Sequence, residues 1–221
     1  MQISEIFESV QGEGKYSGTP SVFIRTSGCN LRCIWCDTKH TSWAPEGTAT
    51  PVEDIIDATD STVPHVVITG GEPLIQCTEL KRLVSALRDR GQVVTIETAG
   101  TIYDDEVTPD LWSVSPKLGN SLPIGHDREL RIHERNNTQS LLPKFVESGR
   151  EIQIKFVMED ETDLDEVLTL MAEYDLPKSA VYLMPQGIDL STLHDRSAWL
   201  GEVCTQHRLN FSPRLQVGLW A

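Results

Sequence analysis

Three cysteines, Cys29, Cys33 and Cys36, share one short segment of this 221-residue chain, directly after the apolar run Val22–Ile24. Three close thiolates favour binding of a metal group. An iron–sulfur cube normally takes four protein thiolates, so three of them would leave one iron with a position open to another ligand. The spacing therefore predicts a cluster with an open iron, where chemistry could begin.

Two other interpretations use the same residues. A structural zinc site needs four closed ligands and would have to recruit His40, Cys77 or Cys204. A redox pair would need only Cys33 and Cys36. Neither uses all three clustered thiols economically, so the iron–sulfur interpretation is favoured over both.

Composition and charge restrict the class of protein. Five cysteines, an odd number, fit metal binding in a reducing compartment better than a disulfide framework. Met1–Glu5 does not begin a signal peptide, and no apolar run approaches the roughly 20 residues of a membrane span. A net charge of −14 opposes binding to a phosphate backbone. We expect a cytoplasmic protein whose direct partners include neither membrane nor nucleic acid.

The elements that position these residues follow from apolar runs and turn signals. Six buried strands are expected, at 22–25, 65–68, 93–96, 111–114, 152–157 and 180–183. Helices are expected to begin at caps formed by Thr50, Thr78 and Thr162, and a last helix should cover 191–207. Residues 118–148 are expected to form an exposed excursion with a charged, helix-like stretch at 127–135.

Six strands separated mostly by helices predict parallel β/α units that form a full or partial barrel, in a single domain over 1–221. Short motifs rich in glycine, proline and polar residues follow the expected strands. They are the cysteine segment, Thr69–Pro73, Glu97–Thr101, Ser115–Lys117 and Met184–Gly187. In parallel β/α barrels the carboxyl ends of the strands form the active-site face, so these motifs should meet there.

The C-x3-C-x2-C spacing and the Gly-Gly-Glu-Pro turn within Thr69–Pro73 resemble radical S-adenosylmethionine (SAM) enzymes, in which SAM occupies the open iron. The resemblance implies a partial parallel (β/α)6 barrel and a SAM site at the carboxyl ends of its strands. The residues that it implies at that site are Trp35, Asp37, Gly71, Glu72, Ser115, Pro116 and Lys117.

Four further segments narrow the resemblance to the 7-carboxy-7-deazaguanine synthase family over most of the chain. They are Gln11–Gly14, Arg25, Cys36–Thr38 and Glu97–Thr101. The resemblance implies a lyase of queuosine and 7-deazapurine biosynthesis that contracts the ring of 6-carboxy-5,6,7,8-tetrahydropterin with loss of ammonia. It also implies a four-iron, four-sulfur cluster (4Fe-4S), SAM and magnesium (Mg²⁺) as cofactors, an electron donor such as flavodoxin or ferredoxin, and a homodimer.

Matching positions give the remaining site residues that the resemblance implies. Cys29, Cys33 and Cys36 would hold the cluster and Thr38 the magnesium, which tolerates a single protein hydroxyl among waters and substrate oxygens. Substrate would meet Val10, Gln11, Gly12, Glu13, Arg25 and Thr69. The Arg25 guanidinium presents a planar fork that suits a substrate carboxylate, although a structural Asp or Glu is the alternative partner. Thr38 could likewise be only a turn residue.

Two alternative functions remain open. An activase that makes a glycyl radical on a partner protein would share the cysteine loop, whereas Gln11–Gly14, Arg25 and Thr38 favour the pterin. A non-catalytic iron–sulfur or zinc module would need a closed metal site. Two departures from the family concern closure of the substrate site: Gln186 stands where we expect an acid, and the tail 213–221 ends soon after the last expected strand.

Overall fold

The protein is described here by a computed structural model, which covers residues 1–59 and 62–219. Within these ranges nine strands form one sheet in the order β3-β1-β2-β4-β5-β6-β7-β8-β9. The strands are β1 (Gln2–Val10), β2 (Pro20–Thr26), β3 (Thr48–Ala49), β4 (His65–Gly70), β5 (Val93–Thr98), β6 (Leu111–Val114), β7 (Glu151–Met158), β8 (Val181–Pro185) and β9 (Asn210–Phe211). From β2 to β9 all pairings are parallel, whereas β1 runs antiparallel to β2 and to β3. The sheet is a partial barrel, with β3 and β9 as its two edges.

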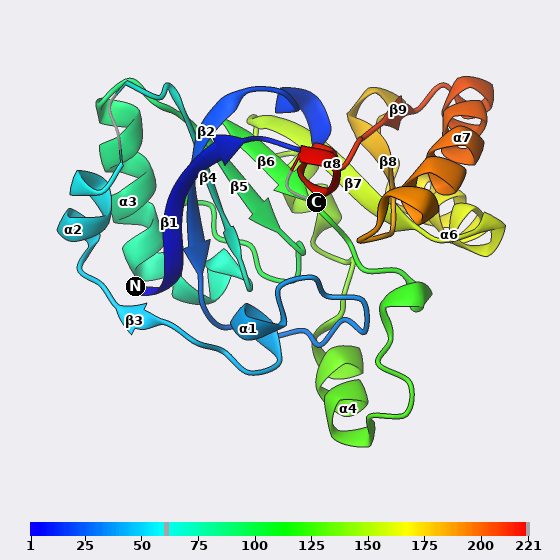
Figure 1. Cartoon of the computed structure of the whole chain (residues 1–221), viewed down its shortest axis with the longest axis horizontal. Coiled ribbons are helices and arrows are strands. Elements are labelled where there is room, and N and C mark those ends of the chain that lie inside the picture. The colour runs from blue at the N-terminus through cyan, green and yellow to red at the C-terminus, as the bar shows by residue number, and fades with distance from the viewer. Residues whose placement is uncertain (60–61, 220–221) are drawn as a thin grey trace.

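Helices connect most of the parallel strands. They are α1 (Lys39–Ser42), α2 (Val52–Asp57), α3 (Cys77–Asp89), α4 (Asp127–Asn136), α5 (Leu142–Val146), α6 (Glu161–Glu173), α7 (Leu190–His207) and α8 (Leu215–Leu219). Figure 1 shows α2 and α3 beside one end of the sheet, α6 and α7 beside the other, and α1 and α4 below the strands. Among the described residues no helix is both long and apolar enough to cross a membrane.

The six expected strands are β2 and β4 to β8, so the predicted α/β class with a largely parallel sheet is confirmed. Each of these strands is an apolar run that packs on both faces, which makes it readable in the sequence. The first segment forms the long strand β1, which adds an antiparallel neighbour to the parallel set. The edge strands β3 and β9 have two residues each and carry no such signal.

The predicted helix caps are wrong in detail. Pro51, not Thr50, is the N-cap of α2, and Gln76 precedes α3 after a 3-10 turn over Pro73–Gln76. Helix α6 begins after Asp160, which forms a capping box with Asp163. A residue type that suits a cap does not by itself fix where a helix begins, and the local backbone path decides which residue caps.

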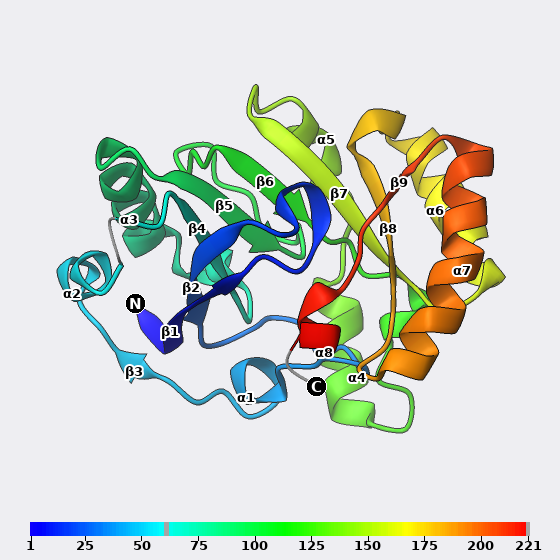
Figure 2. The ribbon, with the colours of Figure 1, turned by 45° about the horizontal axis from the view of Figure 1, so that its top comes forward.

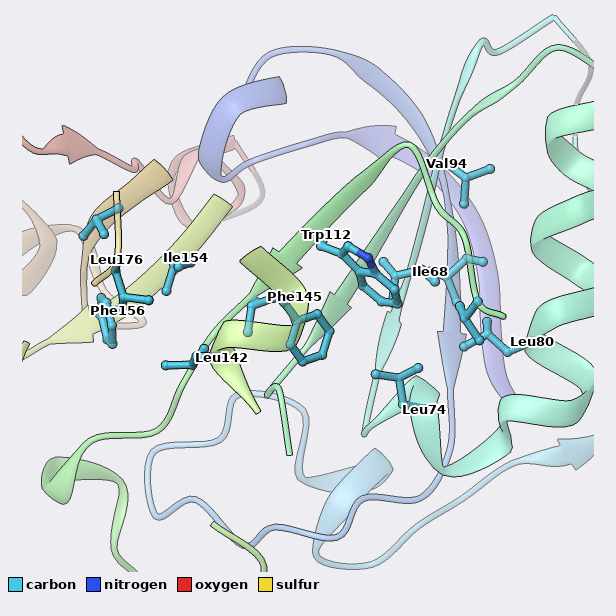
Figure 3. Close-up of a cluster of buried hydrophobic side chains, with 14 of the residues drawn as sticks. Ile68, Leu74, Leu80, Val94, Trp112, Leu142, Phe145, Ile154, Phe156 and Leu176 are labelled. Carbon is cyan, nitrogen blue, oxygen red and sulfur yellow. The ribbon is translucent and has the colours of Figure 1, made fainter. Parts of the chain in front are cut away.

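Residues 118–148 are less exposed than expected. The charged stretch does form α4, but α5 packs onto the sheet, and Phe145 on α5 is fully buried. The Phe145 ring meets the buried Trp112 ring of β6 edge to face, with centroids 5.1 Å apart, and Figure 3 shows the two side by side in the core. An aromatic pair of this geometry contributes packing beyond its buried area.

Candidate active site

A cavity of about 390 Å³ opens at the carboxyl ends of the central strands. Its walls come from the β1–β2 loop, the segment after β2, the turns after β4, β5 and β6, and the chain after β8 and β9. Most of the expected site residues line it: Val10, Gln11, Gly12, Glu13, Arg25, Cys29, Cys33, Trp35, Cys36, Asp37, Thr38, Thr69, Gly71, Ser115 and Lys117. The structure therefore brings the motifs together around one cavity.

The three clustered cysteines share one side of this cavity. The Cys36 sulfur lies 3.2 Å from the Ser42 hydroxyl, and the Cys29 sulfur accepts the Leu31 backbone N–H at 3.4 Å. Burial raises the pKa of Cys29 to about 11 and that of Cys33 to about 12. Thiols so buried need nearby positive charge to become thiolates, and a metal group supplies it.

The donor set fits a cluster better than a single ion. Cys77 and Cys204 do not line the cavity; their thiols donate to the Leu74 and Asn210 carbonyl oxygens. Within 1–59 and 62–219, no three His, Cys, Asp or Glu side chains are arranged to hold one metal ion. A zinc site completed by His40, Cys77 or Cys204 is therefore disfavoured, and three cysteines facing an open cavity match a cluster with one free corner.

In the turn after β4, the backbone of a glycine lines the cavity, and the side chain of the neighbouring glutamate does not. Gly71 lines the wall, and a Cβ there would lie 1.9 Å from the Gly28 carbonyl oxygen, so only glycine allows this approach. Glu72 is fully buried behind the wall, where it accepts from the Leu74 N–H, the Thr98 hydroxyl and the Ala99 N–H. Glu72 thus ties the turn after β4 to the turn after β5.

The segment after β6 places a cation on the same wall. Lys117 donates to the Ser115 carbonyl oxygen and hydroxyl, and its ammonium lies 5.6 Å from the centre of the Trp35 ring. Pro116 is buried and does not line the cavity. Of the expected SAM residues, Trp35, Asp37, Gly71, Ser115 and Lys117 therefore line the cavity.

Glu97 at the end of β5 holds two expected substrate residues in place. Its carboxylate accepts from the Gln11 side-chain amide at 3.2 Å and from the Thr69 hydroxyl at 2.8 Å. Arg25 lines the cavity nearby, with its Nε donating to Glu5 at 2.6 Å and its guanidinium over the Phe7 ring. Glu5 and Arg25 are cross-strand neighbours in the β1–β2 pairing, which brings them together. The structural partner considered for Arg25 is therefore present, and the side chain still reaches the cavity.

Glu13 is the centre of a charge network that sequence reasoning missed. Its carboxylate pairs with the buried Lys155 of β7 at 2.5 Å and with Arg214 of the tail at 3.4 Å, and it accepts from Gln216 at 2.7 Å. Burial opposes ionisation of Glu13, but the two cations outweigh it and hold its pKa at about 2. Glu13 is therefore a fixed anion in the cavity wall. The lone signal in the sequence was a lysine within the apolar strand 152–157.

The remaining expected residues have mixed surroundings. Thr38 lines the cavity and is the N-cap of α1, where its backbone carbonyl oxygen accepts from the Thr41 N–H and hydroxyl, so it also shapes the turn. The Asp37 carboxylate pairs with Arg214 at 2.5 Å. Gln186 lines the cavity and accepts from Arg196 through its side-chain oxygen.

Comparisons with known proteins agree with this geometry. The family model of the Radical SAM superfamily matches residues 23–185, which span the cysteines and strands β4 to β8. A 7-carboxy-7-deazaguanine synthase of Rhodopirellula baltica is 43% identical over 219 residues, covering 97% of this chain and 84% of the relative. One from Halobacterium salinarum is 39% identical and covers 100% of this chain and 90% of the relative.

A solved structure supports the same relationship. The crystal structure of QueE from Escherichia coli superimposes with a TM-score of 0.69 at 27% identity, covering 96% of this chain and 92% of that one. Similarity over nearly the full length, together with three cysteines and a glycine-rich turn on one cavity, identifies the family. This chain belongs to the 7-carboxy-7-deazaguanine synthase family of the radical SAM superfamily.

Proposed function

We propose that this radical SAM enzyme converts 6-carboxy-5,6,7,8-tetrahydropterin to 7-carboxy-7-deazaguanine with loss of ammonia, as a lyase of queuosine and 7-deazapurine biosynthesis. The observation that carries the proposal is one cavity with two different walls. Cys29, Cys33 and Cys36 face it from one side, and the fixed anion Glu13 faces it beside Gln11 from the other. A pterin ring carries N–H donors that such acceptors can bind, and its carboxylate suits Arg25.

Each wall has a proposed role. Cys29, Cys33 and Cys36 would hold a 4Fe-4S cluster, with SAM against Trp35, Gly71, Ser115 and Lys117. Asp37 also lines the cavity and is paired with Arg214, whereas Glu72 and Pro116, which lie outside the cavity, would support that SAM site from behind. When bound, the cluster and SAM supply a 5′-deoxyadenosyl radical that removes hydrogen from C6 of the pterin.

The chain's own contribution is orientation and exclusion of water. Val10, Gln11, Gly12, Glu13, Arg25 and Thr69 would hold the pterin. Glu97 fixes Gln11 and Thr69, so the acceptors are in place before substrate arrives. The proposal also includes a single domain over 1–221, a homodimer, a cytoplasmic location and an electron donor such as flavodoxin or ferredoxin.

A deuterium-transfer experiment tests the reaction. Reconstituted protein would be incubated without oxygen with SAM, a chemical reductant and carboxypterin deuterated at C6. Deuterium should appear in 5′-deoxyadenosine or in recycled SAM, and 7-carboxy-7-deazaguanine should accumulate. Cys33→Ala, which removes one thiolate, should abolish both, whereas Cys77→Ala should not. Deuterium retained in the product, or no product at all, would contradict the proposal.

Magnesium is a separate part of the proposal, supported by the position of Thr38 on the cavity wall. Thr38→Val keeps the shape of the side chain without the hydroxyl oxygen that would meet the ion. The variant should retain cluster and SAM binding and require more magnesium for half-maximal turnover. An unchanged magnesium titration would assign Thr38 to the turn alone.

A further inference from the structure

The C-terminal tail after β9 crosses the mouth of the cavity with little apolar burial. Both ribbon views show α8 between β1 and β8 (Figures 1 and 2). No residue of α8 is buried, and its Leu215 and Leu219 side chains are 38% and 55% exposed. Hydrophobic burial therefore cannot be the main force that holds α8 in place.

Polar contacts hold the tail instead, and most of them involve Arg214. Its guanidinium pairs with Asp37 through Nη2 at 2.5 Å and with Glu13 through Nε at 3.4 Å, and Nη1 donates to the Gly187 carbonyl oxygen at 2.5 Å. The side chains of Arg214 and Glu13 are only 8% and 16% exposed, so solvent screens this pair little, whereas Asp37 is 47% exposed and its pair with Arg214 is screened more. One planar side chain thus joins the loop after β1, the cysteine segment and the loop after β8.

The tail also packs closely onto the substrate loop. The Leu215 N–H donates to the Gly12 carbonyl oxygen at 3.0 Å, and a Cβ at Gly12 would lie 1.9 Å from the Gln216 side-chain oxygen. Gln216 in turn donates to the same Glu13 oxygen that faces Arg214. Any movement of the tail therefore disturbs the hydrogen bonds of Glu13.

We propose that Arg214 is a positioning residue that fastens the C-terminal tail to both walls of the cavity at once. Through its pair with Glu13, Arg214 orders the loop that would meet substrate. Through its pair with Asp37, it links that loop to the end of the cysteine segment. The part of this inference that concerns substrate rests on the proposed function; the fastening itself does not. A lysine cannot replace Arg214 fully, because a single ammonium lacks the fork that reaches two carboxylates and a carbonyl oxygen.

Amide exchange of the tail tests the fastening without substrate or cofactor. The Leu215 and Val217 N–H groups are hydrogen-bonded to Gly12 and Arg214, so their exchange reports release of the tail. Arg214→Gln should speed their exchange by about tenfold or more, since charge-assisted bonds in a buried site are lost. Arg131→Gln is the matched control, because Arg131 is exposed on α4.

A double-mutant comparison tests whether Asp37 acts through Arg214. Asp37→Asn alone should speed exchange by a smaller factor, because the Glu13 pair remains. Asp37→Asn combined with Arg214→Gln should exchange no faster than Arg214→Gln alone, since contacting residues are not additive. Tail exchange in Arg214→Gln that equals the Arg131→Gln control would overturn the proposal, as would fully additive effects of the two substitutions.

Ligand affinities test the consequence for the substrate wall. Arg214→Lys, which keeps the charge, should weaken carboxypterin binding about tenfold, whereas the Arg131→Gln control should leave it unchanged. Unchanged carboxypterin affinity in both Arg214→Lys and Arg214→Gln would refute the positioning role. If the native protein itself does not bind carboxypterin, the proposed function fails, and the exchange data alone decide on Arg214.

Discussion

At the scale of single residues, the cavity is built from charges that other charges hold in place. Glu5 holds Arg25 by its Nε, Glu97 holds Gln11 and Thr69, and Lys155 holds Glu13. A buried charge without a partner is costly, so each of these groups is fixed by the need to keep its partner. The site is therefore ordered before any ligand binds.

Substitution of Arg25 tests whether its planar guanidinium binds the substrate carboxylate. Arg25→Lys keeps the positive charge and loses the fork, so carboxypterin should bind about 10- to 150-fold more weakly, the range for a lost charge-assisted pair. Affinity for SAM should stay unchanged. Calorimetric titration of each ligand without oxygen measures both values. Equal affinity of the native protein for carboxypterin and for an analogue without the carboxyl group would speak against this role.

Lys155 tests the cost of breaking a buried pair. Lys155→Met leaves Glu13 with only Arg214 and Gln216, and the free energy of unfolding should fall by roughly 3 kcal/mol, the lower end for such pairs. Lys15→Met is the matched control, because Lys15 forms a largely exposed pair with Glu151, and it should cost about 1 kcal/mol or less. Urea unfolding of both variants gives the comparison. Equal losses would mean that Lys155 is not an effectively buried partner.

At the scale of elements, two buried histidines join segments that are far apart in the sequence. His65 of β4 is hydrogen-bonded to the Ser21 hydroxyl of β2 and the Thr95 hydroxyl of β5, and its ring meets Tyr16 edge to face. His133 of α4 accepts from the Arg32 N–H and contacts the Ser121 hydroxyl. Burial lowers the pKa of both histidines to about 4, helped at His133 by the nearby Lys117.

These two pKa values predict how stability depends on pH. Between pH 6.5 and about 4 the unfolded chain binds a proton at each histidine and the folded protein does not, so the free energy of unfolding falls as pH falls. Each histidine contributes up to about 3 kcal/mol across this window. His65→Gln should remove about half of the slope in urea unfolding between about pH 7 and pH 5.

Exposed His40 provides the control for that measurement, since His40→Gln should leave the slope unchanged. A slope that His65→Gln does not reduce would show that His65 is charged in the folded protein. His133→Gln should remove a similar share, because the same physical cause lowers its pKa.

At the scale of the whole molecule, the excess of 33 acidic over 19 basic side chains dominates the electrostatics. Two of the basic side chains, Lys155 and Arg214, are largely buried in the pairs around Glu13, which leaves the surface still more acidic. Like charges on a compact surface repel each other more than in the expanded unfolded chain.

Salt should therefore stabilise the protein. Raising sodium chloride from about 20 mM to about 500 mM shortens the Debye length from roughly 20 Å to less than 5 Å and should raise the melting temperature by several degrees. Differential scanning calorimetry at constant pH measures the shift. A melting temperature that falls with salt would mean that attractive ion pairs outweigh the net repulsion. Potassium chloride should act equally if screening is the cause.

Much of the fold could be predicted because its signals are local. The six parallel strands are apolar runs, and glycine-containing turns mark their carboxyl ends, so β2 and β4 to β8 were found. The helix caps and the burial of α5 could not be predicted. Thr50 and Asp160 are both residue types that often cap helices, yet only Asp160 does so. Phe145 lies in a polar stretch, and its packing against Trp112 depends on the position of β6.

By itself the sequence determined the chemistry of the site: the spacing of Cys29, Cys33 and Cys36 and the loop Gln11–Gly14 are contiguous motifs, which chain connectivity alone keeps together. Only the tertiary structure decided which charges meet. Lys155 lies 142 residues from Glu13, and Arg214 lies 177 residues from Asp37. Such pairs depend on strand order, on register and on the path of the tail across the cavity. No local pattern encodes them, because the partners are far apart in the sequence and neither one indicates which residue the other is.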